Sequence, residues 1–201
     1  MNYDLEMEKQ ISSIPEGEEL LLHACCAPCS SACLERLGNY FKVTIFYYNP
    51  NITDENEYKK RLDEIKNFIS RFKTKYEIKL IEGRYNPNEF FEIARGLEAE
   101  PERGKRCYKC YNLRLEETAK IADEYNFKFF CTTLTLSPHK NSNWINEIGS
   151  LLDKKYNGTY LYSDFKKKNR YKRSIELSKE YNLYRQDYCG CIYSKRDKRS
   201  E

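Results

Sequence analysis

Hydrophobic and polar positions alternate along the chain with two periods, one typical of buried strands and the other of helices. Short, continuous apolar runs bounded by turn residues predict strands at Glu19 to Ala24, Lys42 to Tyr48, Glu77 to Ile81 and Lys128 to Leu134. Apolar residues at helical spacing predict a helix ending near Ser13, one at Ser30 to Gly38, one capped by Thr53 or Asp54, and others at Pro87 to Arg95, Cys107 to Tyr125, Asn143 to Lys155 and Arg170 to Tyr181. Strands that alternate with helices are typical of parallel βαβ units.

This order of elements predicts an α/β chain with a Rossmann-like, HUP-like three-layer fold and an open, mainly parallel sheet. No internal repeat or low-complexity linker divides the 201 residues, so we expect one domain, residues 1–201, with a helical, cysteine-bearing segment at its C-terminal end. Ligands of such sheets bind beyond the carboxyl ends of the strands. The turns at Cys25 to Cys29 and at Leu136 to Asn141 are therefore expected to meet at one edge.

Composition places the chain in a reducing compartment. Its longest apolar stretch, around Leu20 to Pro28, is interrupted by His23 and is shorter than the ~20 residues of a membrane span. The charged start, Met1 to Glu6, lacks the apolar region of a secretory signal, so we expect a cytoplasmic protein. Structural disulfides are rare there, and the nine cysteines cannot all pair. We therefore interpret the cysteines as metal ligands, redox groups or both.

Two groups of cysteines have the spacing of metal ligands. Cys25, Cys26 and Cys29 follow the first predicted strand, where the amide groups of a helix N-terminus favour thiolates. Cys107 and Cys110 open another helix with the two-residue gap used for zinc and for iron–sulfur clusters. Adjacent cysteines are awkward ligands for tetrahedral zinc, whereas a cluster offers several iron atoms. Four thiolates around one cluster, from the two helix starts, are thus a hypothesis.

A third group, Cys189 and Cys191, is separated by one glycine. Such a pair forms a disulfide only in a tight ring, which makes the bond easier to reduce and suits electron relay. A further pair of metal ligands is the alternative interpretation. We expect Cys33, Cys131 and His23 to be core residues, because each falls within an apolar part of a predicted element.

Charge and aromatic residues add a second signal. The net charge is +4, but residues 166–201 hold 12 Lys or Arg against 5 Asp or Glu, a local excess of seven. A basic surface attracts phosphates, although a solvated lysine-rich surface explains the same composition. The run Thr132 to Lys140 supplies hydroxyls, an imidazole and an ammonium that suit either phosphate binding or turn capping. Tyr108, Tyr111, Tyr188 and Tyr193 flank the cysteines, and aromatic rings stack on unpaired bases.

Four segments, LLHACCAPCS, ERGKRCYKCYNLRLEETA, TTLTLSPHKN and YRQDYCGCIYS, together resemble the epoxyqueuosine reductase family QueH. They occur in the family's order, between about residues 20 and 194, and include the adjacent cysteines and the closing Cys-Gly-Cys. The resemblance implies an oxidoreductase that performs the last step of queuosine biosynthesis without cobalamin. Its substrate is epoxyqueuosine at the wobble position of tRNAs that read Asp, Asn, His and Tyr codons.

The resemblance also implies cofactors, site residues and partners. By correspondence with the family, the ligands of a [4Fe-4S] cluster are Cys25, Cys26, Cys107 and Cys110, and the redox-active disulfide is Cys189 with Cys191. A second, mononuclear iron occurs in the family, and Cys29 or a nearby carboxylate is a candidate ligand for it here. An external electron donor is implied as a partner besides tRNA. Cys131 stands where the family pattern has another residue, so no role transfers to it.

Removal of an epoxide oxygen takes two electrons and two protons, which side chains without a redox centre cannot supply. A cluster with a cysteine pair can supply the electrons, and an acid among Asp187, Tyr188 and His139 can supply a proton. Two alternatives stay open from the residues alone. One is a thioredoxin-like dithiol oxidoreductase, based on Cys26-Ala27-Pro28-Cys29. The other is a zinc-stabilised RNA-binding module built on the two C-x-x-C pairs.

Overall fold

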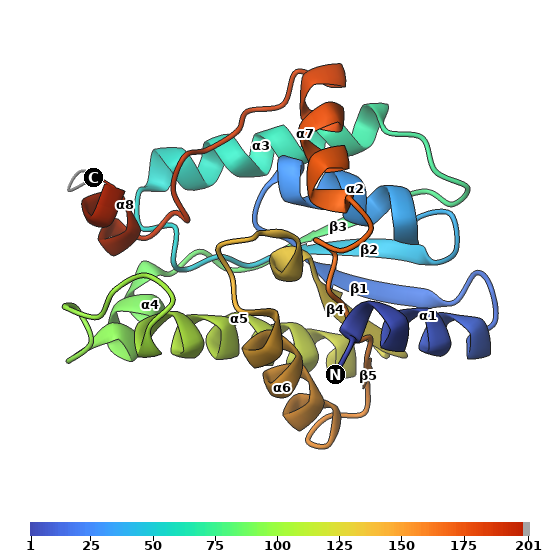
Figure 1. The fold of residues 1–201 in the computed structure, drawn as a ribbon, viewed down its shortest axis with the longest axis horizontal. Helices are drawn as coiled ribbons and strands as arrows, with labels where there is room; N and C mark the ends of the chain where they lie inside the picture. The colour runs from blue at the N-terminus through green and yellow to red at the C-terminus, as the bar shows by residue number, and fades with distance from the viewer. Residues whose placement is uncertain (199–201) are drawn as a thin grey trace.

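An open sheet of parallel strands, in the order β3-β2-β1-β4-β5, forms the centre of the structure (Figure 1). The computed structural model describes the backbone of residues 1–198 and the side chains of residues 1–195. Within them the strands are β1 (Glu19–His23), β2 (Lys42–Tyr47), β3 (Lys79–Glu82), β4 (Phe129–Thr132) and β5 (Thr159–Tyr160). The expected α/β fold with an open parallel sheet is confirmed.

Helices cover both faces of the sheet and give three layers. Figure 1 shows α2, α3 and α7 on one side and α5 and α6 on the other. The helices are α1 (Tyr3–Ser13), α2 (Ala27–Leu37), α3 (Glu55–Arg71), α4 (Pro87–Ala94), α5 (Lys105–Glu124), the 3-10 helix η1 (Thr133–Leu136), α6 (Ser142–Asp153), α7 (Arg170–Glu180) and α8 (Ile192–Lys198). In the described part of the chain, none of these helices combines the length and the apolar character that a membrane crossing requires.

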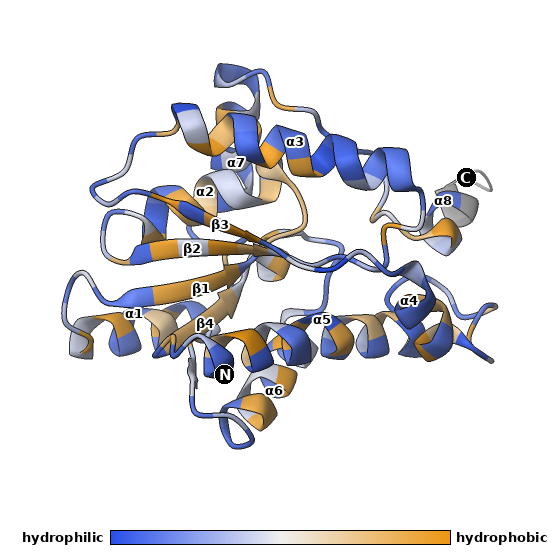
Figure 2. Cartoon of the chain, turned by 180° about the vertical axis from the view of Figure 1, so that it is seen from behind, coloured by the Kyte–Doolittle hydropathy of each residue, from blue (hydrophilic) through white to orange (hydrophobic). Residues whose placement is uncertain are grey.

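Strand β1 is buried on both faces, which explains its continuous apolar sequence. Leu20 and Leu22 pack into the cluster on the side of α2, α3 and α7, whereas Leu21 packs into the cluster on the side of α5 and α6. The period of two along a strand produces this alternation. Figure 2 shows hydrophobic residues along much of the strands, whereas hydrophilic and hydrophobic residues alternate along the helices.

Helix α2 begins at Ala27, earlier than the Ser30 expected from the sequence. Pro28 lies in its first turn, where the missing N–H costs no hydrogen bond and the fixed φ favours the helix. Cys26 is the N-cap, and its carbonyl oxygen accepts the Ser30 N–H at 3.1 Å. The helix thus starts inside the cysteine motif and brings Cys29 into its first turn.

The C-terminal half departs from the predicted elements in three places. Strand β4 ends at Thr132 instead of Leu134, because the Thr132 side chain accepts the Leu134 N–H at 3.2 Å and starts η1. The two-residue strand β5 is too short to leave a periodic signal. Helix α8 lies beyond the last helix whose bounds we predicted, Arg170 to Tyr181, and agrees with the expected helical, cysteine-bearing C-terminal segment.

Candidate active site

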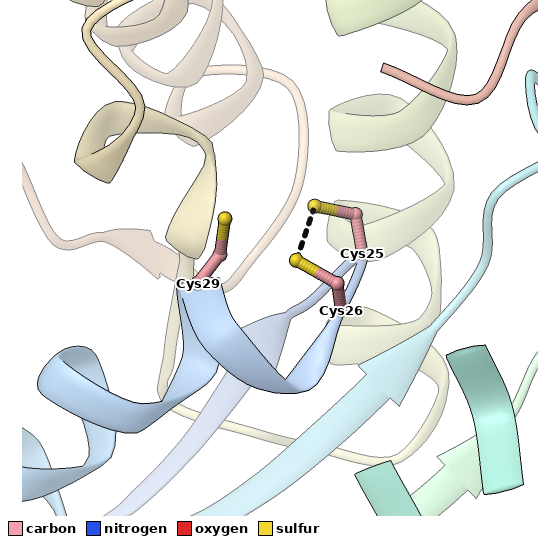
Figure 3. A group of neighbouring side chains, drawn as sticks. All are labelled: Cys25, Cys26 and Cys29. Atoms are coloured by element: carbon pink, nitrogen blue, oxygen red, sulfur yellow. Dashed lines mark hydrogen bonds between the residues drawn. The ribbon is translucent and has the colours of Figure 1, made fainter. Parts of the chain in front are cut away.

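The first group of cysteines lies at the carboxyl edge of the sheet, between the end of β1 and the first turn of α2. The Sγ atoms of Cys25, Cys26 and Cys29 all lie within 4.8 Å of one another. Figure 3 shows the three side chains pointing toward a common space, with the Sγ atoms of Cys25 and Cys26 3.8 Å apart. Three converging thiols at this distance are a donor set for a metal that prefers soft ligands.

Interactions among these three thiols favour one thiolate. Hydrogen bonds from Cys26 and Cys29, and then the positive charges of Lys140 and Arg114, hold the pKa of Cys25 well below its usual value. The pKa of Cys26 is raised to about 12, first because its thiol donates to Cys25. The pKa of Cys29 is raised for the same reason. Cys25 is therefore the thiol of this group that ionises most readily.

The second and third groups meet each other. Cys107 and Cys110, near the N-terminus of α5, and Cys189 and Cys191, ahead of α8, line one small cavity of about 20 Å³. Burial raises the pKa of Cys107 to about 11 and that of Cys110 to about 12. Burial and the neighbouring Cys189 raise the pKa of Cys191. All nine cysteines are free thiols in this structure, so the Cys189–Cys191 pair is described in its dithiol form.

Cys189 also borders a second, larger space. A cleft of about 830 Å³ is lined by Cys25, Cys29 and Cys189, together with the turn after η1 and residues of the C-terminal segment. Lys140 lines this cleft, and it forms no ion pair with the side chains that the structure describes. Burial alone would lower the pKa of Lys140, but nearby Cys189 and Cys25 outweigh burial and raise it. The cleft thus has sulfur and a cation on its walls.

A buried network joins the first group to the second. Arg114, fully buried on α5, has Nη1 3.4 Å from Asn49 Oδ1 and Nε 3.4 Å from the Cys110 carbonyl oxygen. Asn49 Nδ2 in turn donates to the Ala24 carbonyl oxygen at 2.9 Å, directly before Cys25. Burial lowers the pKa of Arg114, but the charges of Cys110, Cys189 and Cys25 outweigh this and raise it. Arg114 therefore interacts electrostatically with cysteines of all three groups.

Other sequence expectations concern residues away from the thiol groups. Cys33 is fully buried and Cys131 is 1% exposed, each within the core cluster of α2, α3 and α7. His23 is fully buried between Thr132 Oγ1 at 2.9 Å and the Tyr48 carbonyl oxygen at 3.1 Å. Burial lowers the pKa of His23 to about 3, so its ring is neutral. Their interpretation as core residues is confirmed.

Sequence reasoning missed the buried arginines. Arg114 lies four residues after Cys110 and seven after Cys107, which puts all three on one helix face. Arg61 on α3 is 1% exposed and contacts the backbone of the Cys189 loop. The four-residue spacing of Glu57 and Arg61 was the signal available in the sequence, but such acid–base pairs are equally common on exposed helices.

Comparisons with known proteins identify one matching family and several relatives of similar sequence. The sequence model of the family described as epoxyqueuosine reductase QueH matches residues 20–197. The epoxyqueuosine reductase QueH of Streptococcus pyogenes is 44% identical over 200 residues, covering 96% of this chain and 78% of the relative. The Staphylococcus epidermidis protein of the same name is 44% identical, with 96% and 84% covered. That of Thermotoga maritima is 33% identical, with 90% and 93% covered.

Proposed function

The chain belongs to the epoxyqueuosine reductase QueH family, and from this premise we propose how it acts. As a member it is an oxidoreductase of queuosine biosynthesis that reduces epoxyqueuosine. We propose that it does so at the wobble position of tRNA, with an iron–sulfur cluster and a redox-active cysteine pair. We propose that the reaction proceeds without cobalamin, with redox groups built on cysteines alone.

The observation that carries the proposal is the cleft of about 830 Å³, because thiols from two separate cysteine groups line it. Its volume lies within the range of sites that enclose a small molecule or a nucleoside. A wobble base is unstacked in an anticodon loop, which makes it accessible to such a cleft. The modified base therefore has a place next to Cys25, Cys29 and Cys189.

The proposed donor set has the chemistry of an iron–sulfur site, with Cys25 bordering the cleft and Cys107 and Cys110 bordering the smaller cavity. The proposed ligands are Cys25, Cys26, Cys107 and Cys110, and thiolates are the ligands that hold such clusters in proteins. The low pKa of Cys25 favours the ionised form that binds iron. Arg114, close to the thiols of Cys25 and Cys110, offsets negative charge that the ligands bring into a buried site. Cys29, within 4.8 Å of Cys25 and Cys26, is the candidate ligand for a second, mononuclear iron.

The reaction must break both C–O bonds of the epoxide, form a C=C double bond and release the oxygen as water, which consumes two electrons and two protons. A bound iron–sulfur cluster supplies one-electron transfer and a Lewis acid. Cys189 and Cys191, as a disulfide, take two electrons and two protons from an external dithiol reductant, which becomes a disulfide. The pair, now two thiols, gives up these electrons and protons inward and becomes a disulfide again.

Side chains that line the cleft stabilise negative charge and donate a proton during the reaction. Lys140 stabilises negative charge that develops on the leaving oxygen, since a fixed cation in a site with little water does so without reorganisation. Asp187, Tyr188 and His139 line the same cleft and remain the candidate proton donors. Burial raises the pKa of Tyr188 to about 12, so its hydroxyl carries a proton at neutral pH.

The proposed partners are tRNAs for Asp, Asn, His and Tyr that carry epoxyqueuosine, and a dithiol electron donor. A tRNA substrate implies that the enzyme works in the cytoplasm. Membership of a reductase family decides against the non-enzymatic zinc module. The thioredoxin-like alternative leaves Cys107, Cys110, Cys189 and Cys191 without a role, although these four line one cavity.

Anaerobic purification followed by addition of iron and sulfide tests the proposal. The protein should turn brown, absorb in the visible cluster band and convert epoxyqueuosine in tRNA to queuosine, followed by mass spectrometry of the nucleosides. Cys107→Ser should lose colour and activity, whereas Cys33→Ala, a change in the core, should keep both. A colourless protein that retains zinc would contradict the cluster, as would an active Cys107→Ser variant.

A further inference from the structure

Helix α3 carries a row of side chains that hold residues 181–190 against it. Arg71 Nη2 donates to the Tyr181 carbonyl oxygen at 3.2 Å, and the Tyr184 N–H donates to Glu64 at 2.9 Å. The Tyr184 hydroxyl donates to Glu57 at 3.1 Å. Positions 57, 61, 64 and 71 share one face of the helix by their spacing. The segment that leads to the Cys-Gly-Cys loop is therefore fixed along one helix.

Arg61, in the same row, contacts the loop itself. Its Nη1 donates to the Cys189 carbonyl oxygen at 3.3 Å and its Nη2 to the Tyr188 carbonyl oxygen at 3.4 Å. Its Nε donates to Glu57 at 2.7 Å, and its side chain is only 1% exposed. One buried cation thus joins α3 to two consecutive carbonyl groups at the start of the loop.

A second contact presses the loop against the segment that follows β2. The Thr53 N–H donates to the Gly190 carbonyl oxygen at 3.3 Å. Gly190 has φ +117°, and a Cβ there would lie 2.8 Å from Cγ1 of Ile52. Only glycine combines this backbone conformation with so close an approach. The loop therefore occupies a defined place between Ile52 and Arg61.

We propose that Arg61 is the positioning residue of the Cys189-Gly190-Cys191 loop, which it holds so that Cys189 borders both the four-thiol cavity and the substrate cleft. Cys189 is the cysteine common to these two spaces. The inference rests on the proposed electron relay, in which this pair passes electrons from an external dithiol to the buried centre. If the loop were released from α3, Cys189 would no longer border the cavity and the cleft, and the electron relay would be interrupted.

Arginine is suited to this task in a way that lysine is not. Its planar fork reaches two carbonyl oxygens while a third donor stays on a carboxylate, whereas an ammonium is a single point of charge. Burial would lower the pKa of Arg61, but neighbouring Cys26 and Glu57 outweigh it and raise the pKa. The guanidinium therefore stays charged and remains a strong donor to the loop.

The loop's exposure can be measured directly in the full chain. Cleavage by trypsin after Arg185 and Lys195 releases Gln186–Lys195, which contains Cys189 and Cys191 and no other cysteine. Reduced, metal-free protein is pulsed with iodoacetamide and digested, and the labelling of this peptide is followed by mass spectrometry. Arg61→Gln should label it roughly tenfold faster or more, since local opening becomes easier.

Two internal comparisons separate loop release from general unfolding. Arg71→Gln removes a similar contact, to the Tyr181 carbonyl oxygen from the same helix face, and should leave the labelling rate unchanged. Cys33 is fully buried, and its labelling reports global unfolding in every sample. Arg61→Lys keeps the charge but loses the fork, so its loop should label faster than the wild-type loop and more slowly than that of Arg61→Gln. It replaces Arg61→Gln if that variant proves too unstable to purify. Unchanged labelling in both Arg61 variants, or equal acceleration at Cys33, would overturn the inference.

Turnover distinguishes this inference from the function on which it rests. In the reconstituted enzyme with a dithiol donor, Arg61→Gln should lower kcat, leave the KM for tRNA unchanged and keep the visible cluster band. Faster labelling with normal kcat would support Arg61 as the anchor and contradict the relay. A wild-type enzyme that never reduces epoxyqueuosine would contradict the proposed function, while the labelling result would still decide the role of Arg61.

Discussion

Arg173 on α7 and Glu35 on α2 form a forked ion pair, with Nε 3.0 and 3.1 Å from the two carboxylate oxygens and Nη2 2.8 Å from Oε1. Arg170 similarly pairs with Asp4 and Glu8 of α1. Within the described part of residues 166–201, Lys166, Lys168, Arg170 and Arg173 therefore have carboxylate partners in the fold, which the sequence excess of seven charges did not reveal. The basic residues left for a polyanion are those without such partners.

Lys167 and Lys172 are exposed and form no ion pair with the described side chains. Lys172 follows Tyr171, which lines the cleft. We expect Lys167→Ala combined with Lys172→Ala to weaken tRNA binding and to reduce the slope of log affinity against log salt by about 1 to 2. Fluorescence titrations at several salt concentrations measure both quantities.

Arg173→Gln is the matched control for this pair. It also removes positive charge from α7, but the charge it removes already has a carboxylate partner. It should leave the salt slope unchanged and cost at most about 1 kcal/mol of unfolding free energy, as is typical of an exposed ion pair. Unchanged affinity and salt slope in the double lysine variant would show that the phosphates are bound elsewhere. An equal loss in both proteins would show that a carboxylate partner does not keep Arg173 from the phosphates.

Gly149 on α6 lies against the ring of Tyr160 on β5. A Cβ at position 149 would overlap that ring, which is 1% exposed and cannot move aside easily. Helix propensity alone would make Gly149→Ala stabilising by about 1 kcal/mol. We expect instead a destabilisation of about 1 to 3 kcal/mol from overpacking, measured by urea unfolding.

The same packing contact can be tested in reverse with a change at Tyr160. In Gly149→Ala combined with Tyr160→Val the overlap is gone, so the added methyl group should cost less than it does in the wild-type background. A double-mutant cycle over these variants measures the coupling. Additive effects of the two changes would mean that the ring does not limit the space at Gly149.

Cys131 gives a prediction for alkaline pH. Burial raises the pKa of Cys131 to about 12 from its ordinary 9.0, so the folded chain keeps this proton after the unfolded chain has lost it. The contribution is thus fully present below pH 9.0 and is lost as the pH rises toward about 12. At about pH 10.5 the loss amounts to about 2 kcal/mol.

Cys131→Val removes this titration. Unfolding free energies of reduced, metal-free protein at about pH 8 and pH 10.5 should therefore fall less steeply in the variant than in the wild type, by about 2 kcal/mol. The variant also loses the contact of Sγ with the Leu161 carbonyl oxygen at 3.2 Å, which lowers stability equally at both pH values. Parallel pH profiles of the two proteins would mean that Cys131 is not shielded from solvent base.

The sequence predicts the strands and the cysteine groups because both leave local signals. β1 is a continuous apolar run, and Cys107 with Cys110 has a fixed spacing. Which groups face each other is a property of tertiary packing. The structure brings Cys189 and Cys191 to Cys107 and Cys110, a contact between residues about 80 positions apart in the sequence that no local spacing encodes.

Polar residues inside the site were hardest to foresee. Arg61 and Arg114 read as ordinary residues of amphipathic helices, since their burial depends on carbonyl groups and thiols supplied by other segments. The start of α2 was misplaced for a local reason, because Pro28 is compatible with both a turn and a first helical turn. The family resemblance supplied roles for the cysteines, but it did not indicate the arginines that surround them.

Cys191→Ser tests whether Cys191 belongs to the electron relay or ligates the cluster. Cys191 is not among the four proposed cluster ligands, so iron content and the visible band should match the wild type after reconstitution. Without Cys191 the loop can form no internal disulfide, so it cannot take up and pass on the two electrons that each reduction consumes. We expect the pre-reduced variant to form less than one queuosine per enzyme and not to turn over repeatedly.

Cys33→Ala, a change at another buried cysteine, should turn over repeatedly and controls for the loss of a thiol. Product per enzyme is counted by nucleoside mass spectrometry, alongside iron analysis of the same samples. Loss of iron from Cys191→Ser would instead make Cys191 a ligand, which its place beside Cys107 and Cys110 in one cavity would also allow. Repeated turnover by Cys191→Ser would remove the pair from the electron path, because a lone Cys189 has no partner with which to form and reopen a disulfide.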